Sequence, residues 1–137
     1  MVDESFQIAN FNELRVTHKM MMAARFCPDP IDLEVPISRV AAGLHDRIMQ
    51  QLMAIEDEEA KIRWDEWLEM FTDRREWDVS VNRAKCDERW LGWSEMEQRF
   101  FTMTLLPSFN VSEGLIAGFV SEVQLYHAKL RDENKAA

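Results

Sequence analysis

Residues 36–55 read PISRVAAGLHDRIMQQLMAI, and their apolar side chains recur at spacings of three and four. This period is that of an α-helix with one buried face. Pro36 suits the first helical position, because the N–H that proline lacks would have no partner there. The stretch therefore predicts an amphipathic helix, and we expect its inner face to consist of Ile37, Val40, Ala41, Leu44, Ile48, Leu52 and Ile55.

Similar apolar periods precede and follow this stretch, and capping and proline signals mark their boundaries. Asn10, Ser94 and Asn110 are each followed three residues later by Glu, which is the spacing of a capping box. Pro28 and Pro107 each interrupt a periodic segment, because proline cannot donate a backbone hydrogen bond inside a helix. We therefore expect six helices, over about residues 10–26, 36–55, 60–75, 78–91, 94–106 and 110–131.

The junction between the second and third predicted helices contains no Gly or Pro. Residues 56–59 read EDEE, so one continuous helix over residues 36–75 is an alternative to a bend near Glu56. A bend lets a chain of 137 residues stay compact around one core. The predicted fold is an all-α, irregular single-domain bundle of about six helices over residues 1–137, with residues 1–9 and 132–137 as flexible ends.

The charge of the chain limits its partners. Sixteen Lys and Arg against 25 Asp and Glu leave a net charge of −9. This charge disfavours nucleic acids and anionic membranes, and it favours a basic protein partner or serves solubility alone. The N-terminus is acidic and no apolar run approaches 18 residues, which predicts a cytoplasmic protein. Cys27 and Cys86 lack the spacing of a disulfide framework or a zinc site, so we expect free thiols.

The residues that catalysis and metal binding most often use are scattered. His18, His45 and His127 fall on three different predicted helices, and none belongs to a Glu-x-x-His pair. No nucleophile elbow or glycine-rich phosphate loop is present. We therefore expect no catalytic residue, metal or cofactor, and no enzymatic activity. A pocket holding two of the three histidines together with a carboxylate would instead favour a small enzyme.

The acidity is concentrated in residues 56–78, which hold ten acidic and four basic residues, a net charge of −6. Within this segment four carboxylates recur at spacings of three, four and three, which places them in one row along a continuous helix. We expect the row to dock on a basic surface, although a solvated helix face would explain the same residues. The predicted partner-binding carboxylates are Glu66, Glu69, Asp73 and Glu76.

Aromatic and methionine residues supply a second candidate surface. All five tryptophans lie within residues 64–93, and Trp77 and Trp93 are expected in connecting segments. Tryptophan is enriched at interface hot spots, so these two are predicted to contact the partner, with packing of helix junctions as the alternative. Three consecutive methionines must spread around a helix, so we expect Met20 to face solvent or a partner.

Part of the chain has a familiar order of residues. Residues 41–47 read AAGLHDR, residues 63–68 read RWDEWL after an acid-rich turn, and residues 90–93 read WLGW. Over about residues 37–93 this order resembles the compact helical phage anti-CRISPR proteins that inhibit type I systems. The resemblance implies a small acidic inhibitor, encoded by a phage or mobile element. Such an inhibitor docks on the helicase–nuclease effector in the host cytoplasm and blocks its recruitment to the DNA-bound surveillance complex.

Three functions are therefore open. The first is a non-catalytic anti-CRISPR inhibitor that binds a basic nucleic-acid-handling protein, such as the helicase–nuclease or the surveillance complex. The second is a regulatory or adaptor subunit of a bacterial assembly with no inhibitory role. The third is a small enzyme with an unrecognised site. None of them requires direct contact with nucleic acid or membrane, and all are compatible with a homodimer.

Overall fold

The computed structural model describes residues 10–30 and 34–136. Within these ranges the chain forms seven α-helices, one short 3-10 turn and no strand, which confirms the predicted all-α class. No helix there is long and apolar enough to cross a membrane. The elements are α1 (Phe11–Arg25), α2 (Glu34–Ile37), α3 (Arg39–Ile55), α4 (Glu58–Leu68), α5 (Arg75–Lys85), the 3-10 turn η1 (Trp90–Gly92), α6 (Glu95–Leu105) and α7 (Glu113–Ala136).

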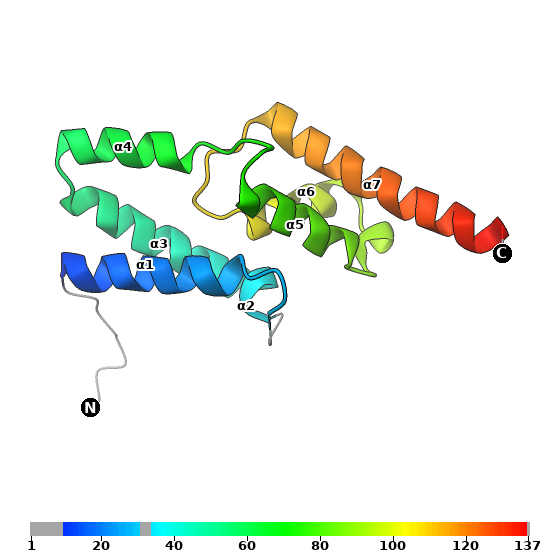
Figure 1. Ribbon diagram of the computed structural model, residues 1–137, viewed down its shortest axis with the longest axis horizontal. Coiled ribbons are helices and arrows are strands. Elements are labelled where there is room, and N and C mark those ends of the chain that lie inside the picture. The colour runs from blue at the N-terminus through cyan, green and yellow to red at the C-terminus, as the bar shows by residue number, and fades with distance from the viewer. Residues whose placement is uncertain (1–9, 31–33, 137) are drawn as a thin grey trace.

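The helices form two packed groups (Figure 1). α1 and α3 run antiparallel with α4 alongside, whereas α5, α6 and α7 pack together at the other end. Contacts of α6 with α2 and α3 join the groups. One hydrophobic core runs through both, and its most deeply buried members include Leu14, Leu52, Met70, Trp90 and Phe119.

Two predicted helix starts are confirmed by their caps. The Asn10 side chain accepts a hydrogen bond of 2.9 Å from the backbone N–H of Glu13. Ser94 and Glu97 form a complete capping box before α6. In both cases a side chain supplies the partner that the first N–H groups of a helix lack, which is why the sequence signal was informative.

The second and third predicted helices are separate. α3 ends at Ile55, and the backbone of Glu56 is extended. The Asp57 carboxylate then caps α4 by accepting a hydrogen bond of 2.8 Å from the N–H of Ala60. The expected bend is therefore confirmed, and the continuous helix over residues 36–75 does not form.

The predicted inner face of α3 is partly wrong. Val40 is 83% exposed, and Leu44 and Ile55 are exposed as well. The helix is rotated so that His45 meets His18 of α1, which turns these apolar side chains outward. Pro36 also lies within α2 rather than at the start of α3. The buried residues of α3 are Ala42, His45, Ile48, Met49 and Leu52.

α4 ends earlier than the apolar period predicts. The carbonyl of Leu68 accepts a hydrogen bond of 2.8 Å from the N–H of Asn110, in the loop between α6 and α7. The N–H of Met70 donates in turn to the carbonyl of Asn110 at 3.0 Å. This pairing holds the backbone extended and buries Met70 in the core, so the helix does not continue to residue 75.

The Arg74 guanidinium covers the same helix end. It donates hydrogen bonds to the carbonyl of Glu69, at 3.0 Å, and to that of Trp67. It also lies 4.9 Å from the ring centre of Trp67 and 4.6 Å from that of Phe109. Arg74, from further along the chain, thus satisfies the last carbonyls of α4. The sequence between this helix and α5 contains no Gly or Pro, the residues that most often indicate a helix end.

The ends of the last helices also differ from the prediction. α5 begins at Arg75, three residues before Asp78. It ends at Lys85 and does not continue to residue 91, because the buried Trp90 turns into the core as part of η1. Ser112, rather than Asn110, precedes α7 and accepts a hydrogen bond of 3.1 Å from the N–H of Leu115. α7 continues to Ala136, past its predicted end near residue 131, and the predicted flexible segment 1–9 lies outside the described residues.

A buried arginine joins α1 to the rest of the molecule. Arg25 is 1% exposed, and its guanidinium donates to three carbonyls. The acceptors are Val35 at 3.1 Å and Pro36 at 3.3 Å, both in α2, and Thr104 of α6 at 2.5 Å. Burial lowers the pKa of Arg25 to about 10, so it is still charged at neutral pH. The carbonyls replace the water that a buried cation loses.

Arginines of α5 satisfy the carbonyls at the end of α1. Arg83 donates to the carbonyl of Arg25 at 2.7 Å and to that of Cys27 at 2.6 Å. Arg75 donates to the carbonyl of Phe26 at 3.4 Å. The C-terminus of α1 is therefore held by charge-assisted hydrogen bonds from another helix rather than by a local cap.

We predict that Arg25→Met lowers the free energy of unfolding by about 3 kcal/mol, because it leaves three inward-facing carbonyls without a donor. Urea unfolding at pH 7.5 measures the change. Arg47→Met is the matched control on the exposed side of α3, and we expect it to shift stability by less than about 0.5 kcal/mol. Equal stability of the two variants would contradict the role given to Arg25.

Candidate functional site

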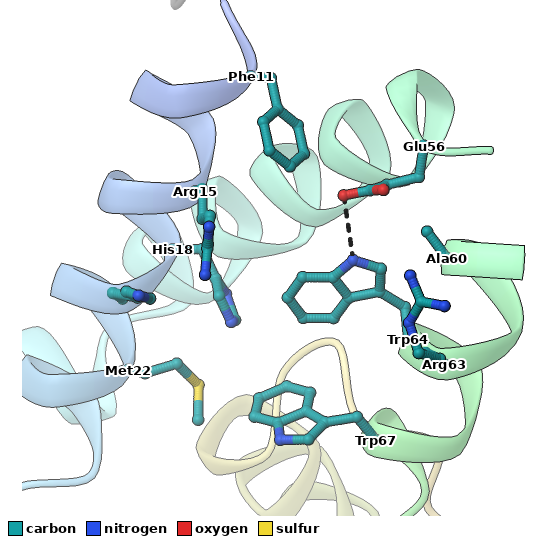
Figure 2. Close-up of a pocket in the computed structure, with 10 residues that line it drawn as sticks. Phe11, Arg15, His18, Met22, Glu56, Ala60, Arg63, Trp64 and Trp67 are labelled. Carbon is teal, nitrogen blue, oxygen red and sulfur yellow. Dashed lines mark hydrogen bonds between the residues drawn. The ribbon is translucent and has the colours of Figure 1, made fainter.

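A pocket of about 650 Å³ lies between α1 and α4 (Figure 2). This volume falls in the usual range of small-molecule sites. α1 supplies one wall, α4 the other, and the bend between α3 and α4 closes one end. The residues that line it are Phe11, Arg15, His18, Lys19, Met22, Glu56, Ala60, Arg63, Trp64 and Trp67.

The two walls repeat one sequence spacing. Four lining residues of α1 and four of α4 each occur at i, i+3, i+4 and i+7, which is a single face of an α-helix. Figure 2 shows the two faces turned toward each other across the pocket. The α1 face consists of Arg15, His18, Lys19 and Met22, and the α4 face consists of Ala60, Arg63, Trp64 and Trp67.

Three aromatic rings meet inside the pocket. The ring centre of His18 lies 5.3 Å from that of Trp64 and 5.5 Å from that of Trp67, and the two indoles are 5.6 Å apart. All three pairs are close to perpendicular, the edge-to-face arrangement that aromatic quadrupoles favour. These contacts attach α4 to α1, since α4 itself buries only Ala60 and Leu68.

His18 contacts a second histidine, His45. Its Nδ1 lies 3.1 Å from Nε2 of His45, and both side chains are buried. Burial lowers the pKa of both rings, and for His45 the neighbouring His18 and Arg25 lower it further, to about 4. Both rings are therefore neutral at pH 7, and one donates a hydrogen bond to the other.

The charge of the pocket is opposite to that of the chain. Arg15, Lys19 and Arg63 line it together with one carboxylate, Glu56, so the site carries +2 in a chain of −9. The Glu56 carboxylate accepts a hydrogen bond of 3.4 Å from Nε1 of Trp64. Within the described ranges, the one ion pair of Arg63 is with Glu59, at 3.5 Å, and both side chains are exposed. The cations thus lie at the rim, where an incoming anion can reach them.

One arrangement expected of an enzyme is present at the pocket only in part. The structure brings together two of the three histidines, and Glu56 lines the same pocket, which is the arrangement named above as favouring an enzyme. However, Glu56 is hydrogen-bonded to Trp64, and His45 does not reach the lining. Among the described residues, no serine, threonine or cysteine lines the pocket, and no three metal-binding side chains form a group.

The predicted row of carboxylates does not form. Glu66 lies on α4, Glu69 and Asp73 lie in the segment after it, and Glu76 lies in the first turn of α5. The side chain of Glu76 is largely buried and pairs with Arg74 at 3.3 Å. The prediction was wrong because it assumed one helix through residue 75, whereas backbone pairing with Asn110 ends α4 at Leu68.

The two predicted tryptophans lie in different environments. Trp77 belongs to α5 rather than to a connecting segment, is 4% exposed and packs edge-on against Phe119 at 5.3 Å. It is therefore a core residue, and its ring is not available to a partner. Trp93 does lie in a connecting segment and is half-buried, with its ring 4.9 Å from that of Phe101. Met20 is exposed, as expected.

The pocket was not predicted from the sequence. Its residues carry a readable signal, since basic and aromatic side chains share one helical face in residues 11–22 and again in residues 60–67. That signal shows two faces of similar character but not that they oppose each other. Only the tertiary contacts of His18 on α1 with Trp64 and Trp67 on α4 bring the two faces together.

Comparison with known proteins identifies no relative. No protein-family model, curated protein or solved structure matches the chain. The pocket, the surface charges and the resemblance described above are therefore the basis for proposing a function.

We predict that the neutral histidine pair makes stability depend on pH. Because the folded-state pKa of His45 is lowered to about 4 from 6.5, the unfolded chain binds its proton first as the pH falls. Stability is fully present above pH 6.5 and decreases between pH 6.5 and about 4, by roughly 3 kcal/mol from this residue.

Urea unfolding of the wild type and of His45→Gln at several pH values tests this. Carboxylates titrate equally in both proteins, so the difference between the two curves reports His45. We expect the wild type to lose about 2 kcal/mol more than the variant between pH 7.5 and 4.5. Parallel curves would show that the pKa of His45 is not lowered by folding.

Proposed function

We propose that the protein is a non-catalytic binding protein that docks on a basic protein partner through the outer face of α4. The observation that carries this proposal is that α4 has two opposite faces. One face lines the pocket. The other, here called the acidic face, consists of Glu58, Ile62, Asp65 and Glu66, at i, i+4, i+7 and i+8, together with Glu69, which directly follows the helix.

The acidic face has the composition of an interface. All five of its residues are exposed, and Ile62 is an apolar side chain with 59% of its surface in solvent. Phe71, which follows directly after this face, is 54% exposed. Apolar anchors surrounded by charges are typical of binding surfaces, in which a few buried residues supply most of the affinity. This face replaces the predicted row and retains only Glu66 and Glu69 of it.

The charge of the face supports a basic partner. The face carries four carboxylates against one neighbouring cation, Lys61, which pairs with Glu58 at 3.5 Å, and the whole chain carries −9. Such a surface attracts a protein that normally binds nucleic acid, because its basic groove attracts phosphates for the same reason. Together with the resemblance over about residues 37–93, this leads us to propose a type I CRISPR effector, the helicase–nuclease or the surveillance complex, as the partner that the protein inhibits.

Charge reversal of Asp65 and Glu66 to Lys tests the acidic face. We expect binding to the purified effector at low salt to weaken by at least about tenfold, because two attractive contacts become repulsive. The matched control reverses Asp132 and Glu133, the same two residue types, exposed near the end of α7. We expect the control to retain nearly wild-type affinity in calorimetry.

The outcomes separate the proposals. If charge reversal leaves the affinity unchanged, the acidic face is not the docking surface. If the wild-type protein binds neither the helicase–nuclease nor the surveillance complex, the CRISPR assignment is wrong. If it binds but leaves target-DNA cleavage by the assembled system unchanged, the adaptor function applies instead of inhibition.

Catalysis at His18 is the second candidate, because the His18–His45 contact lies at a pocket. A general acid–base histidine works best with a pKa near the operating pH. Burial instead lowers the pKa of both rings, which favours the binding function. Titration of the His18 ring by NMR distinguishes the two, since a pKa at or above 6.5 would favour catalysis.

A further inference from the structure

We propose that the pocket between α1 and α4 binds a small molecule with a planar aromatic body and an anionic group. This site is independent of the proposed protein partner, because it lies on the face of α4 opposite the acidic face. Its ligand class follows from three properties of the pocket: its volume, its aromatic lining and its local charge.

The volume and lining set the body of the ligand. A pocket of about 650 Å³ exceeds what one amino-acid side chain fills and matches a compact organic molecule. Phe11, Met22 and Trp64 are only half-buried, and Trp67 is 38% exposed. These apolar surfaces remain in contact with water unless a ligand covers them, so burying them favours binding. Aromatic walls favour a flat aromatic ring over an aliphatic one.

The charge sets the functional group of the ligand. Arg15 and Lys19 are exposed on adjacent turns of α1, at i and i+4, and neither has an ion-pair partner among the described residues. The neighbouring Glu56 is already hydrogen-bonded to Trp64. A carboxylate, sulfonate or phosphate on the ligand would therefore meet two free cations from α1 and Arg63 from α4.

The attachment of α4 allows a ligand to enter. α4 buries only Ala60 and Leu68, close to its two ends, and its middle contacts α1 through the rings of Trp64 and Trp67. A ligand ring can extend these edge-to-face contacts from the open side of the pocket, because Trp64 and Trp67 are only partly buried. His18 forms the floor and stays fixed by its hydrogen bond to His45.

The test uses naphthalene-1-carboxylate and its uncharged analogue of equal size, naphthalene-1-carboxamide, with the full-length protein. We expect the carboxylate to bind with a Kd on the order of 1 mM or tighter, from its number of non-hydrogen atoms. We expect the carboxamide to bind at least about threefold more weakly, because exposed charge pairs contribute modestly. Calorimetry gives both constants, and amide NMR shifts should map to residues 11–22 and 56–67.

The cations are tested by changing Arg15 and Lys19 together to Gln. We expect this variant to bind the carboxylate and the carboxamide equally. Lys129→Gln with Arg131→Gln is the control, because it removes the same two residue types from the exposed surface of α7. The control should keep the wild-type preference for the carboxylate.

Three results would overturn the proposal: no saturable binding of the carboxylate below about 10 mM, far above the range set by ligand size; equal binding of both probes by the wild type; or an unchanged preference in the Arg15 and Lys19 variant. The Asp65 and Glu66 reversal keeps the pocket intact and should bind the carboxylate like the wild type. Loss of partner binding and loss of ligand binding are therefore separate outcomes.

Discussion

The arrangement of the molecule depends on the hydrogen bonds around Arg25 at the end of α1. A guanidinium that is 1% exposed must find partners inside the protein, and it finds them in the carbonyls of α2 and α6. The carbonyls at the end of α1 need donors as well, and Arg83 and Arg75 of α5 provide them. α1 is thereby positioned against three other helices at once, which places one wall of the pocket.

The second wall depends on weaker contacts. α4 has few buried residues, and its end is set by backbone pairing with Asn110 and by the Arg74 guanidinium. Between its ends, the rings of Trp64 and Trp67 contact His18 and remain only partly buried at the edge of the core. A helix attached in this way leaves space beside it, and the pocket is that space. The same attachment leaves the opposite, acidic face exposed, and this is the face on which we propose that a protein partner docks.

The two faces of α4 explain how one acidic protein can offer sites of opposite charge. The acidic face carries four carboxylates, whereas the opposite side of α4 carries Arg63 and two indole rings. The neutral pair of His18 and His45 adds no charge to the pocket near pH 7, because burial lowers the pKa of both rings. The cations that line the pocket are therefore the long side chains of Arg15, Lys19 and Arg63 at its rim, which can adjust to an anion.

The sequence by itself determined the all-α class and the caps at Asn10 and Ser94, because these depend on local hydrogen bonds and on helical periodicity. It favoured a bend near Glu56 but left one continuous helix over residues 36–75 as an alternative. It also indicated the apolar residues Ile48 and Leu52 of the core. Only the tertiary structure decided that α4 stops at Leu68, that Trp77 is buried and that His18 meets His45. Each of these depends on residues from 27 to 42 positions apart in the chain, namely His18 with His45, Leu68 with Asn110 and Trp77 with Phe119, and no local pattern encodes such contacts.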